Sequence, residues 1–524
     1  MAQLQPLQPG PPWRGLRPEG RNEVFVTADG CGQCHSSSAR ALAMTSSTGH
    51  DISPHGLWQA TVMANSARDP FWRAQIAAEV AADPERRDEV EAACLRCHAP
   101  MHAHSRRLGG QAPLAVAEAL QDPLARDGVS CALCHQIQAA GLGSEATFAG
   151  KPRIERGRKV FGPFAQPVAE PMRTFANYEV VHGEHVQRSA LCATCHTLLT
   201  SHTGESFPEQ TPYFEWQNSH FNDEGGRTAT SRTCQECHMA DLGGTRIARD
   251  PGGGDFLLPV RSPYRSHAFV GGNAFLLELL AQNREALAVP ASAAALRTQA
   301  RATRRQLAEA TATIGIGALT RAEGELRFDV RIENLAGHKF PTGFPSRRAW
   351  LHVQVRAGRR VVFDSGGYDR QGRILGVEDA FAQPHATYVT EPDQVVVYEL
   401  VAADADDRGT TRLTQMARRA KDTRLLPQGW RRDGPQAAAT APVGIGNDLD
   451  FTAGGDTVNF AVPFEVFAPA ATVVAWLRYQ TISPHWVDAL RDVDDAACRT
   501  FVTLYDAADK TPELVAVAVR EEER

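Results

Sequence analysis

CATCH, at residues 192–196, repeats a Cys-x-x-Cys-His pattern that occurs four more times in the chain: CGQCH (31–35), CLRCH (94–98), CALCH (131–135) and CQECH (234–238). The five copies hold ten of the eleven cysteines in the 524 residues. One such pentapeptide can arise by chance, but five cannot. We therefore treat the five motifs as the feature that organises the first half of the chain.

The spacing within each motif suits one chemistry in particular. Two thiols three positions apart can form thioether bonds to both vinyl groups of one haem, and the next residue places an imidazole under the iron. Paired cysteines also build zinc or thiol redox sites, but neither requires His after every second Cys. We therefore predict five covalently bound haem c groups, attached at Cys31, Cys34, Cys94, Cys97, Cys131, Cys134, Cys192, Cys195, Cys234 and Cys237, with proximal iron ligands His35, His98, His135, His196 and His238.

A six-coordinate haem iron needs a second, distal ligand, and histidine commonly supplies it in multihaem proteins. Thirteen of the eighteen histidines lie outside the motifs. Four of them stand in segments where small residues or turns would let a ring approach a flat macrocycle, and we predict them as distal ligands: His55, His185, His267 and His338. The fifth ligand stays open among His50, His102, His104, His182, His202 and His220. The alternative for each is a surface or core histidine.

Composition and charge restrict the partners and the compartment. The net charge of -6 gives no basic footprint for nucleic acid. The sequence contains no run of about 18 apolar residues, so we predict no transmembrane helix. The first twenty residues lack the apolar core of a secretory signal. Because covalent haem c is attached outside the cytoplasm, we nevertheless expect a periplasmic, extracellular or cell-surface protein whose export signal was removed or replaced. A cytoplasmic location is the alternative.

Local patterns predict helices around the motifs. Apolar residues recur at helical spacing over 57–80 and are interrupted at Asp69-Pro70, which predicts two helices. Residues 83–98 predict a helix that ends on the second motif, with Asp83 as its N-cap and acidic residues in the first turn.

Beyond the motifs the hydrophobic period changes. Residues 273–311 are rich in Ala, Leu and Arg and predict a helical hairpin. From 312 onward, β-branched residues alternate between turns, with a polar insertion at about 402–440. The expected fold is α+β and multidomain: an irregular lead (1–24), a mainly helical and loop-rich pentahaem cytochrome c domain (25–272), a helical linker (273–311), a β-sandwich-like domain (312–510) and a polar C-terminal tail (511–524).

Two residues outside the motifs bear on the architecture. His338 lies in a loop between two predicted strands, flanked by Gly337 and Gly343. If it binds an iron, the sandwich is docked on the haem domain; otherwise its segment is a structured hairpin loop. The eleventh cysteine, Cys498, is expected to be a buried thiol.

The motifs occur with further strings that carry a family resemblance: SPHGLWQATVMANSARDPFW (53–72), CHAPM (97–101), DGVSCALCH (127–135), CQECHM (234–239), HAFVGGN (267–273) and NLAGHKFPTGFPSRRAWL (334–351). On these residues the chain resembles the multihaem c-type cytochromes, especially bacterial proteins whose haem domain is similar to the tetrahaem cytochromes of hydroxylamine oxidation and is followed by a β-rich part. The resemblance covers about residues 30–355. It implies electron transfer through largely bis-histidine haems and favours the same four distal ligands. Pentahaem nitrite reductases differ, because they carry Lys in place of one motif His.

Three functions compete on this basis. The leading hypothesis is an electron carrier that exchanges electrons with redox proteins, such as other cytochromes or a quinol-linked membrane complex. The second is an oxidoreductase that acts on a small nitrogen or sulfur compound at one haem with an open distal position. The third is a haem-bearing docking module.

Overall fold

The computed structural model describes residues 20–201, 206–377 and 383–523. Within them the chain forms two compact units, which we name the motif unit and the sheet unit. Of the described residues, the motif unit comprises 20–196, 232–302 and 495–504 and contains all five Cys-x-x-Cys-His motifs. The sheet unit comprises the described residues within 197–231, 303–494 and 505–523. Both helices and sheets are present, which confirms the α+β class.

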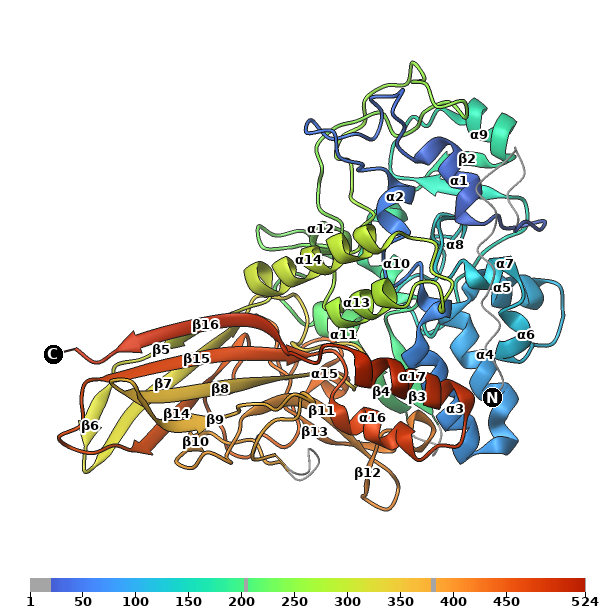
Figure 1. Ribbon diagram of the computed structural model, residues 1–524. Helices are drawn as coiled ribbons and strands as arrows, with labels where there is room; N and C mark the ends of the chain where they lie inside the picture. The colour runs from blue at the N-terminus through green and yellow to red at the C-terminus, as the bar shows by residue number, and fades with distance from the viewer. Residues whose placement is uncertain (1–19, 202–205, 378–382, 524) are drawn as a thin grey trace. The chain divides into compact units, whose positions relative to one another are not determined.

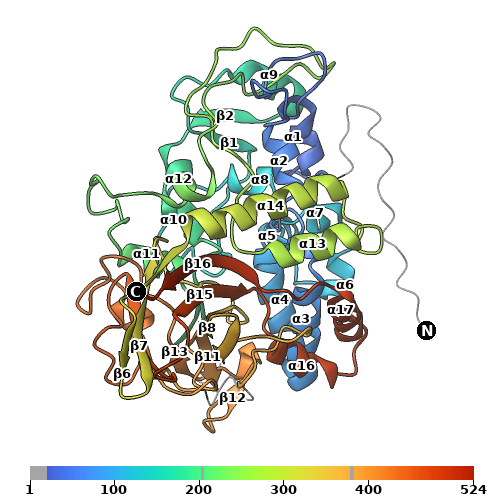
Figure 2. The ribbon, with the colours of Figure 1, turned by 60° about the vertical axis from the view of Figure 1, so that its left-hand side comes forward.

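Short helices carry the motifs in the motif unit. The first, second and fifth motifs end helices α1, α4 and α12, the third forms α8, and the fourth begins within α10. Figure 2 shows α1 and α2 beside each other near α8. The elements before the fourth motif are α1 Ala28–His35, α2 Pro54–Trp58, η1 Ser66–Arg68, α3 Pro70–Ala82, η2 Pro84–Arg86, α4 Arg87–His98, α5 Pro100–Leu108, α6 Val116–Ala119, α7 Pro123–Arg126, α8 Cys131–Cys134, β1 Lys159–Gly162, α9 Ala169–Ala176, β2 Glu179–His182 and η3 Glu184–Gln187. They are followed by α10 Ser189–Ala193, α12 Cys234–His238 and α13 Ala274–Gln282.

The predicted helix break at Asp69-Pro70 is confirmed. The Asp69 carboxylate accepts the backbone N–H groups of Phe71 at 2.8 Å and Trp72 at 3.2 Å and so caps α3. The prediction that Asp83 caps the next helix is wrong. Asp83 makes no capping bond, because a single 3-10 turn (η2) follows it and α4 begins only at Arg87.

The sheet unit contains two large sheets that share one core (Figure 1) and a two-stranded sheet of β3 and β4. The five-stranded sheet has the order β10-β14-β7-β5, with β6 paired to β7, and the seven-stranded sheet has the order β12-β11-β8-β15-β16, with β13 and β9 paired to β11 and β8. The elements are β3 Leu198–Ser201, β4 Ser206–Gln210, α11 Pro212–Gln217, β5 Ala312–Ile316, β6 Thr320–Ala322, β7 Glu325–Asn334, β8 Arg348–Ala357, β9 Arg360–Ser365, β10 Tyr388–Val389, β11 Val397–Ala403, β12 Gly409–Thr410, η4 Leu413–Gln415, β13 Arg418–Asp422, α15 Ala437–Thr440, β14 Gly455–Pro463, β15 Ala471–Gln480, α16 Pro484–Arg491 and β16 Glu513–Glu521. Helices α14 Ala293–Ala310 and α17 Ala496–Ala507 each cross a boundary between the units.

Alternation of apolar and polar residues explains the long strands. In β7 and in β15 every second side chain is buried. Phe328 of β7 and Phe460 of β14 pair across the register and stack with ring centroids 4.9 Å apart.

Two predicted segments differ in the structure. The region 402–440, expected as a polar insertion, contains β13, which pairs antiparallel with β11. The expected polar tail contains β16, which pairs antiparallel with β15 and so forms an edge of the seven-stranded sheet. Its alternate apolar residues include Val517 and Val519, which are exposed. No helix among the described residues is both long and apolar enough to cross a bilayer.

Candidate functional site

The motif cysteines meet in pairs that come from different motifs. Three pairs of thiols from different motifs lie close enough to raise one another's pKa: Cys31 with Cys131, Cys97 with Cys195 and Cys192 with Cys234. Cys134 lies close enough to Cys192 and Cys195 to influence their ionisation. The fourth motif therefore neighbours the second, third and fifth motifs, and the first neighbours the third.

The ionisation of these thiols argues against a thiol redox site. Interaction with the neighbouring thiol, and then burial, raises the pKa of Cys131, Cys192 and Cys195 well above the ordinary value. Burial raises the pKa of Cys134 to about 11. Reactive CxxC cysteines have lowered pKa values, because the thiolate is the nucleophile. A structural zinc site needs four donors at one point, and among the described residues no three of these thiols lie within ligand distance of one another.

Backbone carbonyls hold four of the five motif imidazoles. In each of them the Nδ1–H donates to a carbonyl, which fixes the neutral tautomer whose lone pair is on Nε2. That tautomer is the one that can ligate a metal through Nε2. The bonds join His35 to Ile247 at 2.7 Å, His98 to Ser66 at 3.1 Å, His135 to Phe161 at 2.7 Å and His238 to Val270 at 2.6 Å. The fifth, His196, follows α10, and its backbone N–H donates to Cys192 at 2.9 Å.

Burial favours the neutral form of three motif imidazoles. It lowers the pKa of His35 and His135, and it lowers the pKa of His98 to about 4. Trp72 stacks on the His98 ring with centroids 4.5 Å apart and planes within 4°. The stacking therefore fixes the plane of the His98 ring, and the bond to the Ser66 carbonyl fixes the position of its Nδ1.

His267 lies opposite a motif histidine. Its ring centroid is 6.4 Å from that of His135, and the two planes differ by 19°. Two imidazoles bound to one metal at about 2 Å each would place their centroids roughly 6 Å apart. The Nδ1–H of His267 donates to the carbonyl of Arg265 at 3.0 Å, and burial lowers the pKa of His267 to about 4.

The structure also brings His55 and His185 next to motifs. His55 lies against Gly32 of the first motif, where an added Cβ would come within 2.9 Å of the ring, and its Nδ1 hydrogen bonds with Ser36 at 3.2 Å. His185 is buried beside the third motif, edge-on to Phe161. Its Nε2 is bonded to the carbonyl of Ile137 at 2.8 Å, which differs from the arrangement in the motif histidines.

Among the six alternatives for a fifth distal ligand, His102 stands out. It lies on α5, is 4% exposed and forms a 2.7 Å bond from Nδ1–H to the Asp122 carboxylate. Its Nε2 is buried and has no hydrogen-bond partner among the residues that the structure describes. A histidine that donates one nitrogen to a carboxylate and presents the other is typical of metal ligands.

The other five alternatives have different surroundings. The Nδ1 of His104 hydrogen bonds with Arg107 at 3.0 Å. His50, His182 and His220 are exposed, and His202 lies outside the described residues.

His338 belongs to the sheet unit, in the loop between β7 and β8. Its Nδ1–H donates to the carbonyl of Lys339 at 2.8 Å. Lys339 is fully buried, and its backbone N–H donates to Glu215 at 3.0 Å. The loop is therefore tightly structured, while the role of His338 as an iron ligand stays a prediction.

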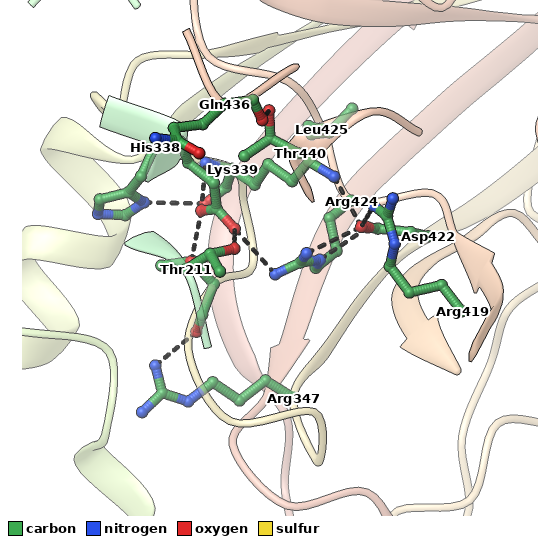
Figure 3. A network of polar contacts seen from close by, with 12 residues as sticks. Thr211, His338, Lys339, Arg347, Arg419, Asp422, Arg424, Leu425, Gln436 and Thr440 are labelled. Atoms are coloured by element: carbon green, nitrogen blue, oxygen red, sulfur yellow. Dashed lines mark hydrogen bonds and ion pairs between the residues drawn. The ribbon is translucent and has the colours of Figure 1, made fainter. Parts of the chain in front are cut away.

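A buried ion network holds this loop, with Lys339, Arg424 and Arg419 converging on Asp422 (Figure 3). Arg424 also contacts Glu215 at 3.1 Å. Burial alone would raise the pKa of Asp422, but Arg424, Lys339 and Arg419 outweigh it and hold that pKa well below its usual range. Burial lowers the pKa of Lys339 to about 8, although Asp422 opposes the shift.

Comparison with solved structures identified one protein with a similar fold. The chain is similar to a penta-heme cytochrome c552 from Thermochromatium tepidum. The match has a TM-score of 0.51 and 16% sequence identity, and it covers 91% of this chain and 99% of that chain. Comparison with protein-family models and with curated proteins gave no match. At this identity the similarity concerns the fold alone, but it extends over both units.

The sequence contains one signal for the surroundings of His102, namely the helix start at Asp122. Asp122 stands directly before Pro123 and caps α7, where its Oδ1 accepts the N–H of Leu124 at 2.9 Å. Its second oxygen is then directed to His102. An Asp-Pro helix start is readable from sequence, but the pairing across 20 residues is not.

Proposed function

We propose that the chain is an electron carrier with five covalently attached haem c groups, one at each motif. The observation that supports it best is the pairwise proximity of thiols from different motifs. Neighbouring attachment points are expected to bring the attached groups close together, and electron transfer requires short separations. When bound, haem supplies one-electron chemistry that no side chain of the motifs offers.

The residues of the chain fit this cofactor. Each motif offers two thiols and an imidazole, and carbonyls of other segments hold four of the imidazoles at Nδ1. Such second-layer hydrogen bonds orient a metal ligand and raise its basicity. Burial around His98 and His135 excludes water from the ligand nitrogen and favours the neutral ring.

The distal ligands are proposals of unequal support. His267 is proposed opposite His135, because the separation of their rings suits two ligands of one metal. His102 is proposed as the fifth ligand, because its buried Nε2 and its bond to Asp122 suit a metal ligand. His55, His185 and His338 are retained on the sequence argument.

The same proposal gives a compartment and partners. Covalent haem c attachment takes place outside the cytoplasm, so we place the protein in the periplasm or at the cell surface. Its partners would be other cytochromes or a quinol-linked membrane complex. The formal charge of -6 would become more negative with ionised propionates, which favours a cationic docking surface on the partner.

Haem counting tests the proposal. The exported full-length chain should contain five haems by pyridine haemochrome assay, with a matching mass increase. Replacing both cysteines of any one motif by Ala should reduce the count to four. Cys498→Ala is the matched control, since Cys498 is buried, lies outside the motifs and donates to the Ala74 carbonyl at 3.3 Å. A chain whose mass shows no porphyrin would reject the proposal.

Carbon monoxide separates a carrier from a catalyst. A chain in which every iron has two protein ligands should show no change in its reduced spectrum with carbon monoxide at neutral pH. Stoichiometric binding at one haem would instead favour the oxidoreductase with an open distal position.

A further inference from the structure

A second group of metal-ligating side chains lies in the sheet unit, away from any motif. His385, Asp448 and Asp456 each offer a donor atom, and these atoms lie within 4.8 Å of one another. The Nε2 of His385 is 2.9 Å from Asp448 Oδ2 and 3.7 Å from Asp456 Oδ2. The side chains of His385 and Asp456 are 0% exposed and that of Asp448 is 2% exposed.

The three residues come from separate segments. His385 precedes β10, Asp448 lies in the loop before β14, and Asp456 is on β14. Tyr398, from β11 of the other sheet, donates its hydroxyl to Asp456 Oδ2 at 2.7 Å. Phe451 packs edge-on to the His385 ring with centroids 5.5 Å apart. The group is therefore enclosed between residues of both sheets.

Hydrogen bonds direct the donors inward but leave two of their atoms unsatisfied. Asp448 Oδ1 accepts the N–H groups of Asp450 at 2.8 Å and Phe451 at 3.1 Å, so its Oδ2 is the oxygen directed to His385. Asp456 Oδ1 and His385 Nδ1 are buried and have no hydrogen-bond partner within the described part of the chain. Buried polar atoms are normally paired, and exceptions in native proteins commonly mark a bound ion or water.

The charge of these three side chains also favours a bound cation. Two carboxylates enclosed away from water carry two negative charges, and one protonated imidazole would balance only half of them. A divalent cation would balance both carboxylates.

We propose that His385, Asp448 and Asp456 bind a divalent transition-metal cation such as Zn²⁺ or Mn²⁺. Donors bound to one such ion at about 2.1 Å lie roughly 3 to 3.5 Å apart, and the separations of 2.9 Å and 3.7 Å from His385 Nε2 lie close to this range. An imidazole donor favours these ions over Mg²⁺ and Ca²⁺, which prefer oxygen ligands. Tyr398 would orient the Asp456 carboxylate through its hydrogen bond to Oδ2. The ion would tie the segment before β10 and the loop before β14 to the sheet.

Metal analysis of the exported full-length protein tests this site. After incubation with ZnCl₂ and gel filtration, one zinc per chain is expected beside the haem iron, and Zn²⁺ should raise the melting temperature of the sheet structure. His385→Ala should lose both effects. His352→Ala is the matched control, because His352 pairs with Asp364 at 2.9 Å elsewhere in the same unit, and it should keep both.

A second variant and a second ion guard against a folding defect. Asp456→Asn keeps the shape of the side chain and should lower zinc content to the level of His385→Ala, and Mn²⁺ bound to the wild type should give an immobilised EPR signal. Wild-type protein that retains neither zinc nor manganese would overturn the site. So would a His385→Ala variant that retains zinc at the wild-type level. Neither result bears on the haem count, so this inference stands or falls separately.

Discussion

Replacing Asp122 by Asn should raise the reduction potential of one haem. The Asp122 carboxylate accepts the Nδ1–H of His102 at 2.7 Å, and this bond is also one cause of the lowered pKa of Asp122, although burial opposes that shift. A carboxylate partner makes the imidazole more basic and so favours ferric over ferrous iron. Asn can still cap α7 at this position, so the fold is expected to persist.

The magnitude follows from the single bond that changes. Loss of such a second-layer partner typically lowers metal affinity about ten- to a hundredfold. If the loss falls on the ferric state, each tenfold change is about 59 mV for one electron, which gives a rise of about 60 to 120 mV. Spectroelectrochemical titration of the exported protein with its haems attached would measure it. Asp364→Asn, which alters the His352 pair, is the control and should leave all potentials unchanged. Unchanged potentials in Asp122→Asn would refute the role of His102 as ligand.

Three further predictions concern the ion network and one distal ligand. Asp422→Asn should lower the free energy of unfolding of the sheet unit by about 3 to 5 kcal/mol, because the buried Lys339 loses its carboxylate partner; amide exchange over 335–347 should accelerate accordingly. The pKa of Lys339 is lowered to about 8 in the fold, so its contribution to stability is present above its unfolded value and lost as the pH falls through 8. Wild type should therefore gain up to about 3 kcal/mol over Lys339→Met between pH 8 and 10.5, as measured by denaturant titration. His267→Ala should convert one low-spin haem to high-spin in the EPR spectrum, whereas the exposed His50→Ala should not.

Local chemistry could be read from the sequence, and distant pairing could not. The five motifs, the Asp69-Pro70 helix start and the period of two in β7 and β15 depend on residues close together in the chain. Residues 197–231 instead belong to the sheet unit, where Glu215 contacts Lys339 and Arg424. Hydrophobic periodicity reports on neighbouring residues, so it cannot predict contacts between residues more than 100 positions apart, such as those of Glu215.

The C-terminal strand shows a different limit. Residues 511–524 are charged at their end and were predicted as a tail, yet β16 pairs with β15 along nearly its whole length. Val517 and Val519 are exposed on this edge strand, so alternation there does not separate a buried from an exposed face. Backbone pairing, which has no side-chain signature, decides the structure of such an edge.

The two units also differ in the size of the hydrophobic cores inside each of them. The sheet unit has one large continuous core, to which β7, β8, β14 and β15 all contribute, and a small second cluster around Trp350. In the motif unit the described apolar side chains form separate clusters, for example around Tyr178, around Leu95 and around Leu277. Small separate cores rarely stabilise a fold alone, and bound metal groups commonly supply the missing free energy. Chain produced without haem attachment should therefore show fast amide exchange throughout the motif unit and retain protection in β7, β8, β14 and β15. Equal protection in both units would mean that the motif unit folds without its cofactors.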